Sequence, residues 1–151
     1  LACRFETVDD RPRVVLDGAH NRSKIKTTID NLKKIAFKNL YVIIAIADNK
    51  YHISILEQII PYTDRIFFTR FHNKYRKCAR PKELQVKSKQ YFKKGARSKI
   101  YRDPERALSD ASNDVQPDDI ILVVGSFFLA GELRKRCYSE EEVLRLRKSF
   151  Y

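Results

Sequence analysis

One short segment, Asp17-Gly18-Ala19-His20-Asn21, combines residue types that can carry chemistry. Asp17 can accept hydrogen bonds from sugar hydroxyls or from a metal-bound water, and His20 can donate or transfer protons near neutral pH. Gly18 lets a ligand approach the backbone, and the helix expected after this segment offers unpaired N–H groups to an anion. A structural alternative stays open, in which Asn21 caps that helix and Asp17 is a turn residue.

A second segment, Gly125-Ser126, repeats this arrangement, because it follows the apolar run 119–124 and precedes a helix. Ser126 either caps that helix, which stabilises it by about 1 kcal/mol, or holds a carboxylate or phosphate at the helix N-terminus. In open parallel sheets, ligands bind outside the carboxyl ends of the strands. We therefore expect a candidate site where these two segments follow their strands.

Several familiar catalytic motifs are absent from the sequence. It contains neither GxxxxGK[ST] nor GxGxxG, so no self-contained nucleotide-binding motif is evident. Its three histidines are scattered, with no metal-ligand spacing, and no Ser-His-Asp arrangement is recognisable. Because the sequence also starts at Leu1 and contains no methionine, we expect it to be an excised piece of a longer protein that supplies the rest of the site.

The apolar patterning predicts an α/β domain with a mainly parallel sheet covered on both faces. Doubly buried or β-prone runs place strands at 40–47, 65–69, 99–102 and 119–124. Helical spacing and capping signals place helices at 25–36, 53–60, 81–91, from 104 onward and after Ser126. Asp103 and Pro104 are the expected N-cap and first residue of the helix that begins there.

The first residues predict a β-hairpin. Two β-prone runs, 4–8 and 13–17, flank Asp9-Asp10-Arg11-Pro12, whose acidic residues and proline favour a turn. If Val8 pairs with Arg13, the antiparallel register places Arg4 opposite Asp17. The sequence therefore predicts that Arg4 and Asp17 are cross-strand neighbours.

Composition sets the class of protein. The 151 residues include 31 basic and 19 acidic side chains, a formal charge of +12, and 43% are hydrophobic. These values suit a single folded domain over residues 1–151 and exclude disorder or low complexity. The apolar runs at 41–47 and 120–130 are too short or too broken for a bilayer, which needs about 20 residues. Three scattered cysteines favour free thiols, so we expect a cytoplasmic protein without a membrane partner.

A basic run at 70–80 interleaves Phe71 and Tyr75 with cations. Such a run can follow a nucleic-acid backbone and stack bases on its aromatic rings. We favour the alternative of a solvated basic loop, so a nucleic-acid partner is not expected. Positive charge beside a binding site can also steer polyanionic substrates toward it.

Six segments occur in the order typical of one known family: Arg4-Phe5-Glu6, Val15-Leu16-Asp17-Gly18-Ala19-His20-Asn21, Ala47-Asp48-Asn49-Lys50, Arg80-Pro81-Lys82-Glu83-Leu84, Asp103-Pro104-Glu105-Arg106-Ala107-Leu108 and Leu122-Val123-Val124-Gly125-Ser126-Phe127-Phe128-Leu129. Together they resemble the C-terminal domain of the folylpolyglutamate synthase/dihydrofolate synthase family, within the Mur ligase superfamily. The resemblance covers about residues 4–133. Gly18 points to the folate branch of the superfamily rather than to the cell-wall ligases.

This resemblance implies a three-layer α/β/α, Rossmann-like domain with a six-stranded mixed sheet whose first strand is antiparallel. It also implies that the strands ending at Asp17 and Ser126 are neighbours. Family members are ATP-dependent ligases that phosphorylate a folate or dihydropteroate carboxylate, after which the amine of L-glutamate attacks the acyl-phosphate. The implied partners are ATP, L-glutamate, the folate substrate and an N-terminal ATP-binding domain. That domain, absent from this chain, would carry the phosphate loop and hold Mg²⁺, so the isolated domain is expected to be inactive.

The resemblance also implies roles for five residues. Arg4 is a catalytic and cofactor-binding residue that reaches toward the ATP phosphates and the acyl-phosphate. Asp17 contacts the nucleotide, at its ribose, or orients Arg4, and Asn21 belongs to the same nucleotide-binding set. His20, a second catalytic residue, and Ser126 lie beside the incoming amino acid or the reacting phosphate. No residue of this chain is expected to bind a metal.

Two other functions stay open at this point. One is the C-terminal domain of a Mur-type peptidoglycan ligase, and the other is a basic nucleic-acid-binding α/β module without ligase activity. The sequence departs from the family pattern at Arg22, where the family has proline, at 48–51 and at 76–80. These departures leave the expected fold intact and bear on substrate identity.

Overall fold

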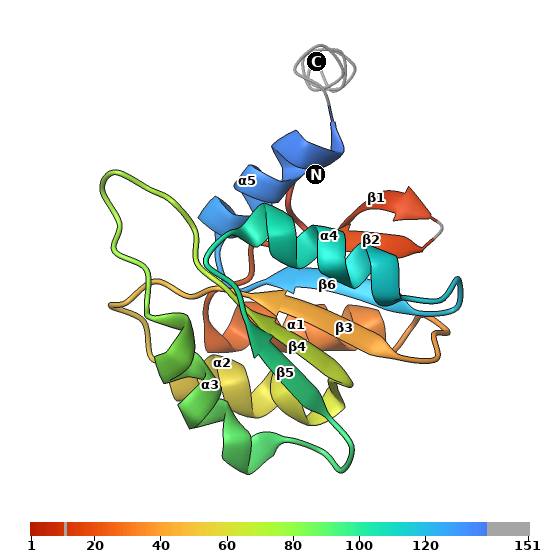
Figure 1. The fold of residues 1–151 in the computed structure, drawn as a ribbon, viewed down its shortest axis with the longest axis horizontal. Coiled ribbons are helices and arrows are strands. Elements are labelled where there is room, and N and C mark those ends of the chain that lie inside the picture. Colours follow the sequence, from red (N-terminus) through yellow and green to blue (C-terminus); the bar gives the residue numbers. More distant parts are fainter. Residues whose placement is uncertain (11, 139–151) are drawn as a thin grey trace.

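The computed structural model of the 151-residue chain describes residues 1–10 and 12–138. In this part of the chain, six strands form one mixed sheet in the spatial order β1-β2-β6-β3-β4-β5 (Figure 1). The strands are β1 (Glu6–Asp10), β2 (Arg13–Leu16), β3 (Leu40–Ile44), β4 (Arg65–Phe68), β5 (Arg97–Ile100) and β6 (Ile120–Val124). The helices are α1 (Arg22–Leu32), α2 (His52–Ile59), α3 (Pro81–Ser88), α4 (Pro104–Asp114) and α5 (Phe127–Cys137), with short 3₁₀ turns at Ile60–Tyr62 and Lys89–Tyr91.

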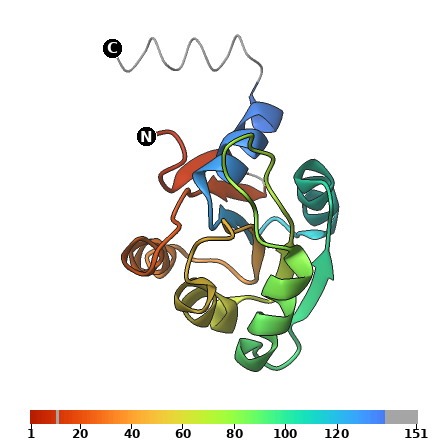
Figure 2. The same cartoon turned by 90° about the vertical axis from the view of Figure 1, so that its left-hand side faces the viewer.

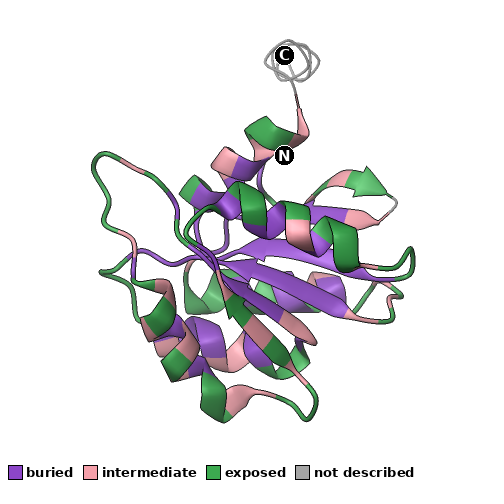
Figure 3. Cartoon of the chain, viewed as in Figure 1, coloured by how far each residue is buried: buried purple, intermediate pink, exposed green. Residues whose placement is uncertain are grey.

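The central strands pair in parallel. β6 lies between β2 and β3, and β3 continues through β4 to β5, while only β1 runs antiparallel to its neighbour. All five residues of β3 and all five of β6 are buried, as Figure 3 shows for the middle of the sheet. Strands buried on both faces have near-continuous apolar sequences, which explains why these two runs lack alternation.

Helices cover both faces of the sheet, which Figure 2 shows from its edge. Ile120, Leu122 and Val124 point into a core shared with α1, α2 and α3. Ile121 and Val123 point the other way, into a core shared with α4 and α5. Because side chains alternate along a strand, a single buried strand supplies both cores. The α/β class and the mainly parallel, doubly covered sheet predicted from the sequence are confirmed.

The predicted elements are found with shifted ends. The helix expected at 25–36 is α1 and ends at Leu32, and the strand expected at 99–102 is β5 and starts at Arg97. Asp103 caps α4 as predicted, since its Oδ1 accepts from the backbone N–H of Glu105 at 3.0 Å. Within residues 1–10 and 12–138, no helix has the length and apolar character needed to cross a membrane.

The predicted hairpin exists, but its predicted register is wrong. Glu6 faces Leu16, so the strand starts two residues later than expected and Arg4 is not opposite Asp17. Cys3 and Phe5 have φ values of 56° and 49°, a left-handed conformation that cannot continue a strand. A second irregularity lies between Thr7 and Asp9, after which Asp10 pairs with Arg13. Asp9 and Asp10 therefore belong to β1 rather than to the turn, at an exposed sheet edge where charged side chains are tolerated.

The N-terminal segment is held against the fold by an ion pair between Glu6 and Arg134 of α5. Arg134 donates from Nε to Glu6 Oε1 at 2.8 Å and from Nη2 to Oε2 at 3.0 Å. The side chains are only 11% and 16% exposed for Arg134 and Glu6, respectively. Glu6 Oε1 also accepts from the backbone N–H of Cys3 at 3.0 Å, so one carboxylate fixes both the first residues and α5. Burial alone would raise the pKa of Glu6, but these hydrogen bonds outweigh burial and lower it.

We expect Glu6→Gln to lower the free energy of unfolding by about 2 kcal/mol, because it leaves the largely buried Arg134 guanidinium without its counter-charge. The matched control is Arg22→Gln, which breaks an ion pair to Glu57 in which the arginine is 72% exposed. That change should cost less than about 0.5 kcal/mol. Urea titration of both variants provides the comparison, and equal losses would contradict the role given to Glu6.

The same ion pair predicts a pH dependence. Because the folded-state pKa of Glu6 is lowered, its stabilising effect is complete above the ordinary carboxyl pKa of 4.5. That effect disappears as the pH falls through the folded-state pKa. The stability difference between wild type and Glu6→Gln should therefore shrink on acidification below about pH 4.5, and a constant difference would argue against it.

Candidate functional site

Three loops meet at the carboxyl edge of the parallel strands. Residues 17–21 follow β2, residues 125–126 follow β6, and residues 45–51 follow β3. These three strands are neighbours in the sheet, with β6 between β2 and β3. Backbone hydrogen bonds join the first two loops: Asp17 N–H donates to Val123 O at 2.9 Å and Gly125 N–H donates to Ala19 O at 2.9 Å. The expectation that Asp17 and Ser126 end neighbouring strands is therefore confirmed.

The N-terminal segment reaches the same edge. The backbone N–H of Gly18 donates to Cys3 O at 2.7 Å, which brings Arg4 alongside the 17–21 loop although it is not paired with Asp17. The Arg4 side chain is exposed and makes no hydrogen bond or ion pair with another described residue. The backbone of Arg4 is thus fixed beside this loop. Its guanidinium has no internal partner in the described part of the chain.

Asp17 is buried and its carboxylate is bonded inside the fold. Oδ2 accepts from the Thr28 hydroxyl of α1 at 2.7 Å, and Oδ1 accepts from the backbone N–H of Ala19 at 3.0 Å. Burial raises the pKa of Asp17, although these two hydrogen bonds and the charge of Lys24 act in the opposite direction. The carboxylate therefore shapes the 17–21 loop and is not in contact with Arg4 in this structure.

We expect Asp17→Asn to change how stability depends on pH. Because the folded-state pKa of Asp17 is raised, its contribution to the stability of the fold is complete below the ordinary aspartate pKa of 3.8. That contribution is lost as the pH rises through the folded-state pKa. Relative to wild type, Asp17→Asn should therefore gain stability between about pH 4 and pH 7. Chemical denaturation across this range measures the difference, with Asp30→Asn on the exposed face of α1 as control. If the stability of Asp17→Asn depended on pH as that of wild type does, burial of Asp17 would not raise its pKa.

His20 packs against Phe127 over Gly18. The two rings have centroids 5.4 Å apart, and His20 Nδ1 lies 2.9 Å from the Gly18 carbonyl oxygen, so Nδ1 donates and the neutral ring keeps Nε2 as its acceptor. A Cβ added to Gly18 would lie 2.6 Å from Phe127 Cγ. Gly18 is therefore required for the contact of the Phe127 ring with the loop backbone, a reason that the sequence reading did not consider.

A double-mutant cycle tests this role of Gly18. Gly18→Ala should destabilise the fold by about 1–2 kcal/mol, because the added methyl group displaces the Phe127 ring. In the background of Phe127→Ala the same change should cost less than about 0.5 kcal/mol, because the space is then empty. Thermal or urea unfolding of the four proteins gives the coupling energy. Equal effects in both backgrounds would show that Gly18 is needed for another reason.

Asn21 and Ser126 both act as helix caps. Asn21 Oδ1 accepts from Lys24 N at 3.0 Å at the start of α1, and Ser126 Oγ accepts from Phe128 N at 3.0 Å at the start of α5. Gly125 precedes this cap with a φ of 106°, and a Cβ there would collide with the Ala45 carbonyl oxygen. The capping alternatives left open by the sequence are thus present, and Ser126 additionally lines a cavity.

That cavity, of about 220 Å³, brings the loops together into one candidate site. Its polar and charged lining comes from His20, Asn49, Lys50, Arg76 and Ser126, and the rings of Phe127 and Phe128 complete it. Lys50 and Arg76 bring positive charge to this cavity, and no carboxylate lines it. Ser126, which lines the cavity, is also the N-cap of α5, so the N-terminus of that helix lies beside the cavity. Such a donor set suits a carboxylate or a phosphate group.

The same lining is unsuited to a divalent cation, which prefers carboxylate and carbonyl oxygens. Across residues 1–10 and 12–138, no group of three or more His, Cys, Asp or Glu side chains is arranged to hold a metal ion. A magnesium ion bound to a nucleotide would therefore take its protein ligands from elsewhere. The residues that line this cavity fit an anionic group of a ligand, and they do not fit a metal ion.

The structure brings His20 and Ser126 into one cavity and places Arg4, Asp17 and Asn21 around it without lining it. Lys50, Asn49 and Arg76 were not among the predicted site residues. The first two follow β3, so the rule that singled out the loops after β2 and β6 applies to them equally. Arg76 arrives from the long 70–80 loop, whose path no sequence pattern indicates.

Comparison with known proteins identifies the relatives of this chain. The family model described as "Mur ligase, glutamate ligase domain" matches residues 3–127. A probable bifunctional folylpolyglutamate synthase/dihydropteroate synthase of Halobacterium salinarum is 27% identical over 138 residues, covering 88% of this chain and 16% of the relative. The folylpolyglutamate synthase of Lacticaseibacillus casei is 26% identical over 132 residues, covering 87% of this chain and 28% of the relative.

Solved structures agree on the fold. The Mycobacterium tuberculosis folylpolyglutamate synthase complexed with ADP and AMPPCP superimposes with a TM-score of 0.78 at 21% identity. The match covers 93% of this chain and 33% of that one. This chain therefore spans less than a third of the length of the two curated relatives and a third of the solved structure.

Proposed function

The chain belongs to the glutamate ligase domain family of Mur ligases, and from this membership we propose that it is the C-terminal domain of an ATP-dependent folate glutamate ligase. In this proposal the domain helps to bind ATP and L-glutamate while an amide bond forms through an acyl-phosphate. The observation that carries the proposal is the cationic cavity in which His20 and Ser126 meet at the carboxyl edge of the sheet. Membership in the folylpolyglutamate synthase/dihydrofolate synthase branch is supported by the relatives.

The cavity suits the anionic groups of such a reaction. Lys50 and Arg76 can pair with the carboxylate of an incoming amino acid or with a phosphate oxygen, and the α5 N-terminus at Ser126 adds backbone N–H groups. His20 lines the cavity with Nδ1 bonded to Gly18 O, so Nε2 of the neutral imidazole can accept a proton from the ammonium of the amino acid, and the resulting free amine is the nucleophile. We assign His20 and Ser126 to this amino-acid side of the reaction.

Arg4, Asp17 and Asn21 are assigned to the nucleotide side. The Arg4 guanidinium is exposed beside the 17–21 loop and can reach phosphate oxygens of a nucleotide held by another domain. Asp17 and Asn21 hold the shape of that loop through Thr28, Ala19 and Lys24. In this proposal, Asp17 and Asn21 keep the backbone of the 17–21 loop in place, and through it the adjoining segment that carries Arg4.

An upstream domain completes the proposed enzyme. This chain spans less than a third of its curated relatives, has no nucleotide-binding loop motif, and has no metal-binding group among its described residues. ATP and magnesium would therefore be held mainly by an N-terminal ATP-binding domain, over which the present domain closes to exclude water from the acyl-phosphate. The three cysteines are free thiols, which suits the cytoplasm as the proposed location.

The test is ADP release by the longer protein that includes this domain and the ATP-binding domain. It receives ATP, magnesium and L-glutamate with dihydropteroate, a reduced folate or a muramyl acceptor. Release that requires both glutamate and a pterin substrate supports the folate ligase. Release only with the muramyl acceptor favours the peptidoglycan ligase instead, and silence with every acceptor contradicts a ligase function.

Arg4→Ala offers the cleanest test of a single role. We expect it to lower kcat by about 100-fold or more without changing stability, since its side chain has no partner among the described residues. Arg97→Ala at the opposite edge of the sheet is the matched control and should keep wild-type turnover. Asp17→Ala is less informative, because it also removes the hydrogen bonds to Thr28 and Ala19. Wild-type-like turnover of Arg4→Ala would exclude its assigned role.

A further inference from the structure

The turn of residues 47–50 follows β3 and carries two groups of the candidate site. Asn49 and Lys50 line the cavity of about 220 Å³ together with Ala47, the first residue of the turn. Lys50 N–H donates to Ala47 O at 3.2 Å, and this hydrogen bond closes the turn. The Ala47 carbonyl group therefore fixes the backbone from which the Asn49 and Lys50 side chains extend.

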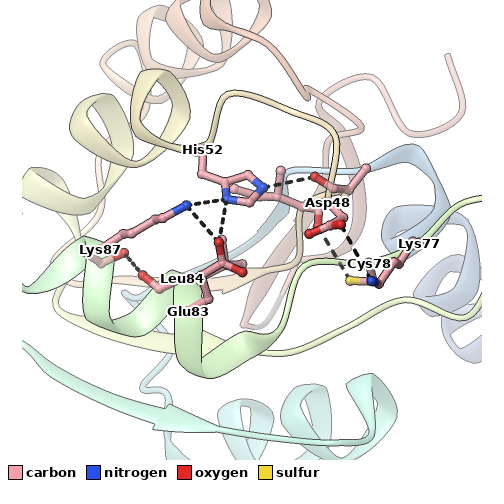
Figure 4. Close-up of polar contacts among 10 residues, drawn as sticks. Asp48, His52, Lys77, Cys78, Glu83, Leu84 and Lys87 are labelled. Carbon is pink, nitrogen blue, oxygen red and sulfur yellow. Dashed lines mark hydrogen bonds and ion pairs between the residues drawn. The ribbon is translucent and has the colours of Figure 1, made fainter.

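A buried histidine bonds the same carbonyl oxygen. His52, the first residue of α2, is 4% exposed, and its Nε2 lies 3.1 Å from Ala47 O. Lys87 Nζ of α3 lies 3.1 Å from Nδ1 of the same ring (Figure 4). An ammonium group has donors only, so Lys87 donates, Nδ1 accepts, and the neutral ring carries its proton on Nε2. The imidazole of His52 thus connects the 47–50 turn to α3.

The position of Lys87 is fixed within α3. Glu83, one helical turn earlier, accepts from Lys87 Nζ through Oε1 at 2.9 Å. The same carboxylate oxygen is 3.9 Å from His52 Nδ1, beyond hydrogen-bond distance, so Lys87 is the partner of that nitrogen. Contacts therefore run without a break from Glu83 through Lys87 and His52 to Ala47.

No other described side chain bonds the backbone of the 47–50 turn. Tyr51, the N-cap of α2, is 74% exposed and makes no side-chain capping hydrogen bond. The Ser54 hydroxyl donates to Tyr51 O at 2.8 Å, outside the turn. Within the described residues, the hold on this turn from the side of the helices therefore depends on His52.

Backbone hydrogen bonds join the turn to the basic loop of residues 70–80, which connects β4 to α3. Asp48 N–H donates to Lys77 O at 2.8 Å, and Figure 4 shows these two residues side by side. Just before the turn, Ile46 O accepts from Ala79 N–H at 2.8 Å. The turn and this end of the basic loop thus form one unit.

The other end of the basic loop is fixed as well. Phe71 is 3% exposed and packs on Phe128 of α5 with ring centroids 5.3 Å apart. Arg70 Nε donates to Arg102 O at 2.9 Å. Between these ends the loop forms a cationic surface around a cavity of about 650 Å³, and Arg76 lines both this cavity and that of the candidate site. Support for the 47–50 turn is therefore support for Arg76 as well.

We propose that His52 is a positioning residue of the candidate site. Its neutral imidazole, held by Lys87, fixes the Ala47 carbonyl group and so orders the 47–50 turn before the carboxylate of an incoming amino acid arrives. A turn that is already ordered loses less entropy when the ligand binds. The inference rests on the proposed function, which supplies that ligand. His52 does not line the cavity, so it acts on the ligand only through the turn.

This role has a specific kinetic signature. The carboxylate that the turn would bind is not the reacting group, because the amine of the amino acid attacks the acyl-phosphate. Its contacts are therefore equally strong in the ground state and in the transition state. Loosening the turn should raise the KM for L-glutamate and leave kcat nearly unchanged. A histidine that only satisfied a buried carbonyl oxygen would affect stability and neither constant.

The test is the L-glutamate dependence of ADP release by the longer protein, with the pterin substrate saturating. His52→Asn has a side chain too short to reach Ala47 O and should raise the KM for L-glutamate by about fivefold, with kcat within about twofold of wild type. His52→Gln can place an amide N–H where Nε2 lies and should return KM to within about twofold of wild type. An unchanged KM in His52→Asn, or equal KM values in the two variants, would overturn the proposal.

Thr63→Val is the matched control for lost stability. The Thr63 side chain is fully buried, and its hydroxyl donates to Ile59 O at 2.8 Å at the other end of α2. The change therefore removes a buried hydrogen bond to a carbonyl oxygen, as His52→Asn does, but away from the cavity. It should lower the stability and keep the KM for L-glutamate. A KM raised as much as in His52→Asn would show that general destabilisation is the cause.

Amide hydrogen exchange in this chain gives a readout without turnover. In His52→Asn the N–H groups of Asp48 and Lys50 should exchange about fivefold faster relative to that of Val42 in β3, and in His52→Gln they should not. Unchanged exchange in His52→Asn would overturn the proposal whether or not the longer protein is active. Faster exchange in a chain whose longer protein releases no ADP supports the hold of His52 on the turn and contradicts the ligase function alone.

Discussion

The structure depends on the burial of β6 between β2 and β3. A strand covered on both faces has no access to water, so every backbone N–H and C=O must be bonded by a neighbouring strand. That requirement fixes the parallel registers of β2, β6 and β3 together. All three strands therefore end at the same edge of the sheet, and the loops that follow them lie side by side there. The candidate site is a consequence of how the core satisfies its hydrogen bonds.

Much of this arrangement follows from the sequence. The uninterrupted apolar runs of β3 and β6 indicate strands buried on both faces, and Asp103-Pro104 marks the start of α4 by local chemistry alone. The 17–21 and 125–126 segments were singled out because each follows a strand, and the family resemblance implied that the two strands are neighbours. The strands, the cap and the choice of these segments are local or depend on the rules of parallel sheets, so they can be predicted without knowledge of tertiary contacts.

Other features depend on contacts that sequence patterns do not record. The left-handed conformations of Cys3 and Phe5 shift the hairpin register, and neither is a glycine that would have signalled it. The nucleic-acid alternative required Phe71 as an exposed ring beside Tyr75, yet Phe128, 57 positions later, covers it. Arg76 enters the candidate site only because the long loop is fixed at both ends. Each of these is decided by packing between segments far apart in the chain.

The basic loop has one further consequence, which concerns divergence among related domains. Its junction with the loop after β3 is made largely by backbone groups, at Asp48–Lys77 and Ile46–Ala79. Backbone hydrogen bonds do not depend on side-chain identity, so Lys74 and Arg76 can be exchanged without loosening the junction. Selection can therefore alter the charge and ligand preference of this surface while the sheet and the loop glycines at its edge, Gly18 and Gly125, stay unchanged. The fold separates the residues that keep it folded from those that are free to change what it binds.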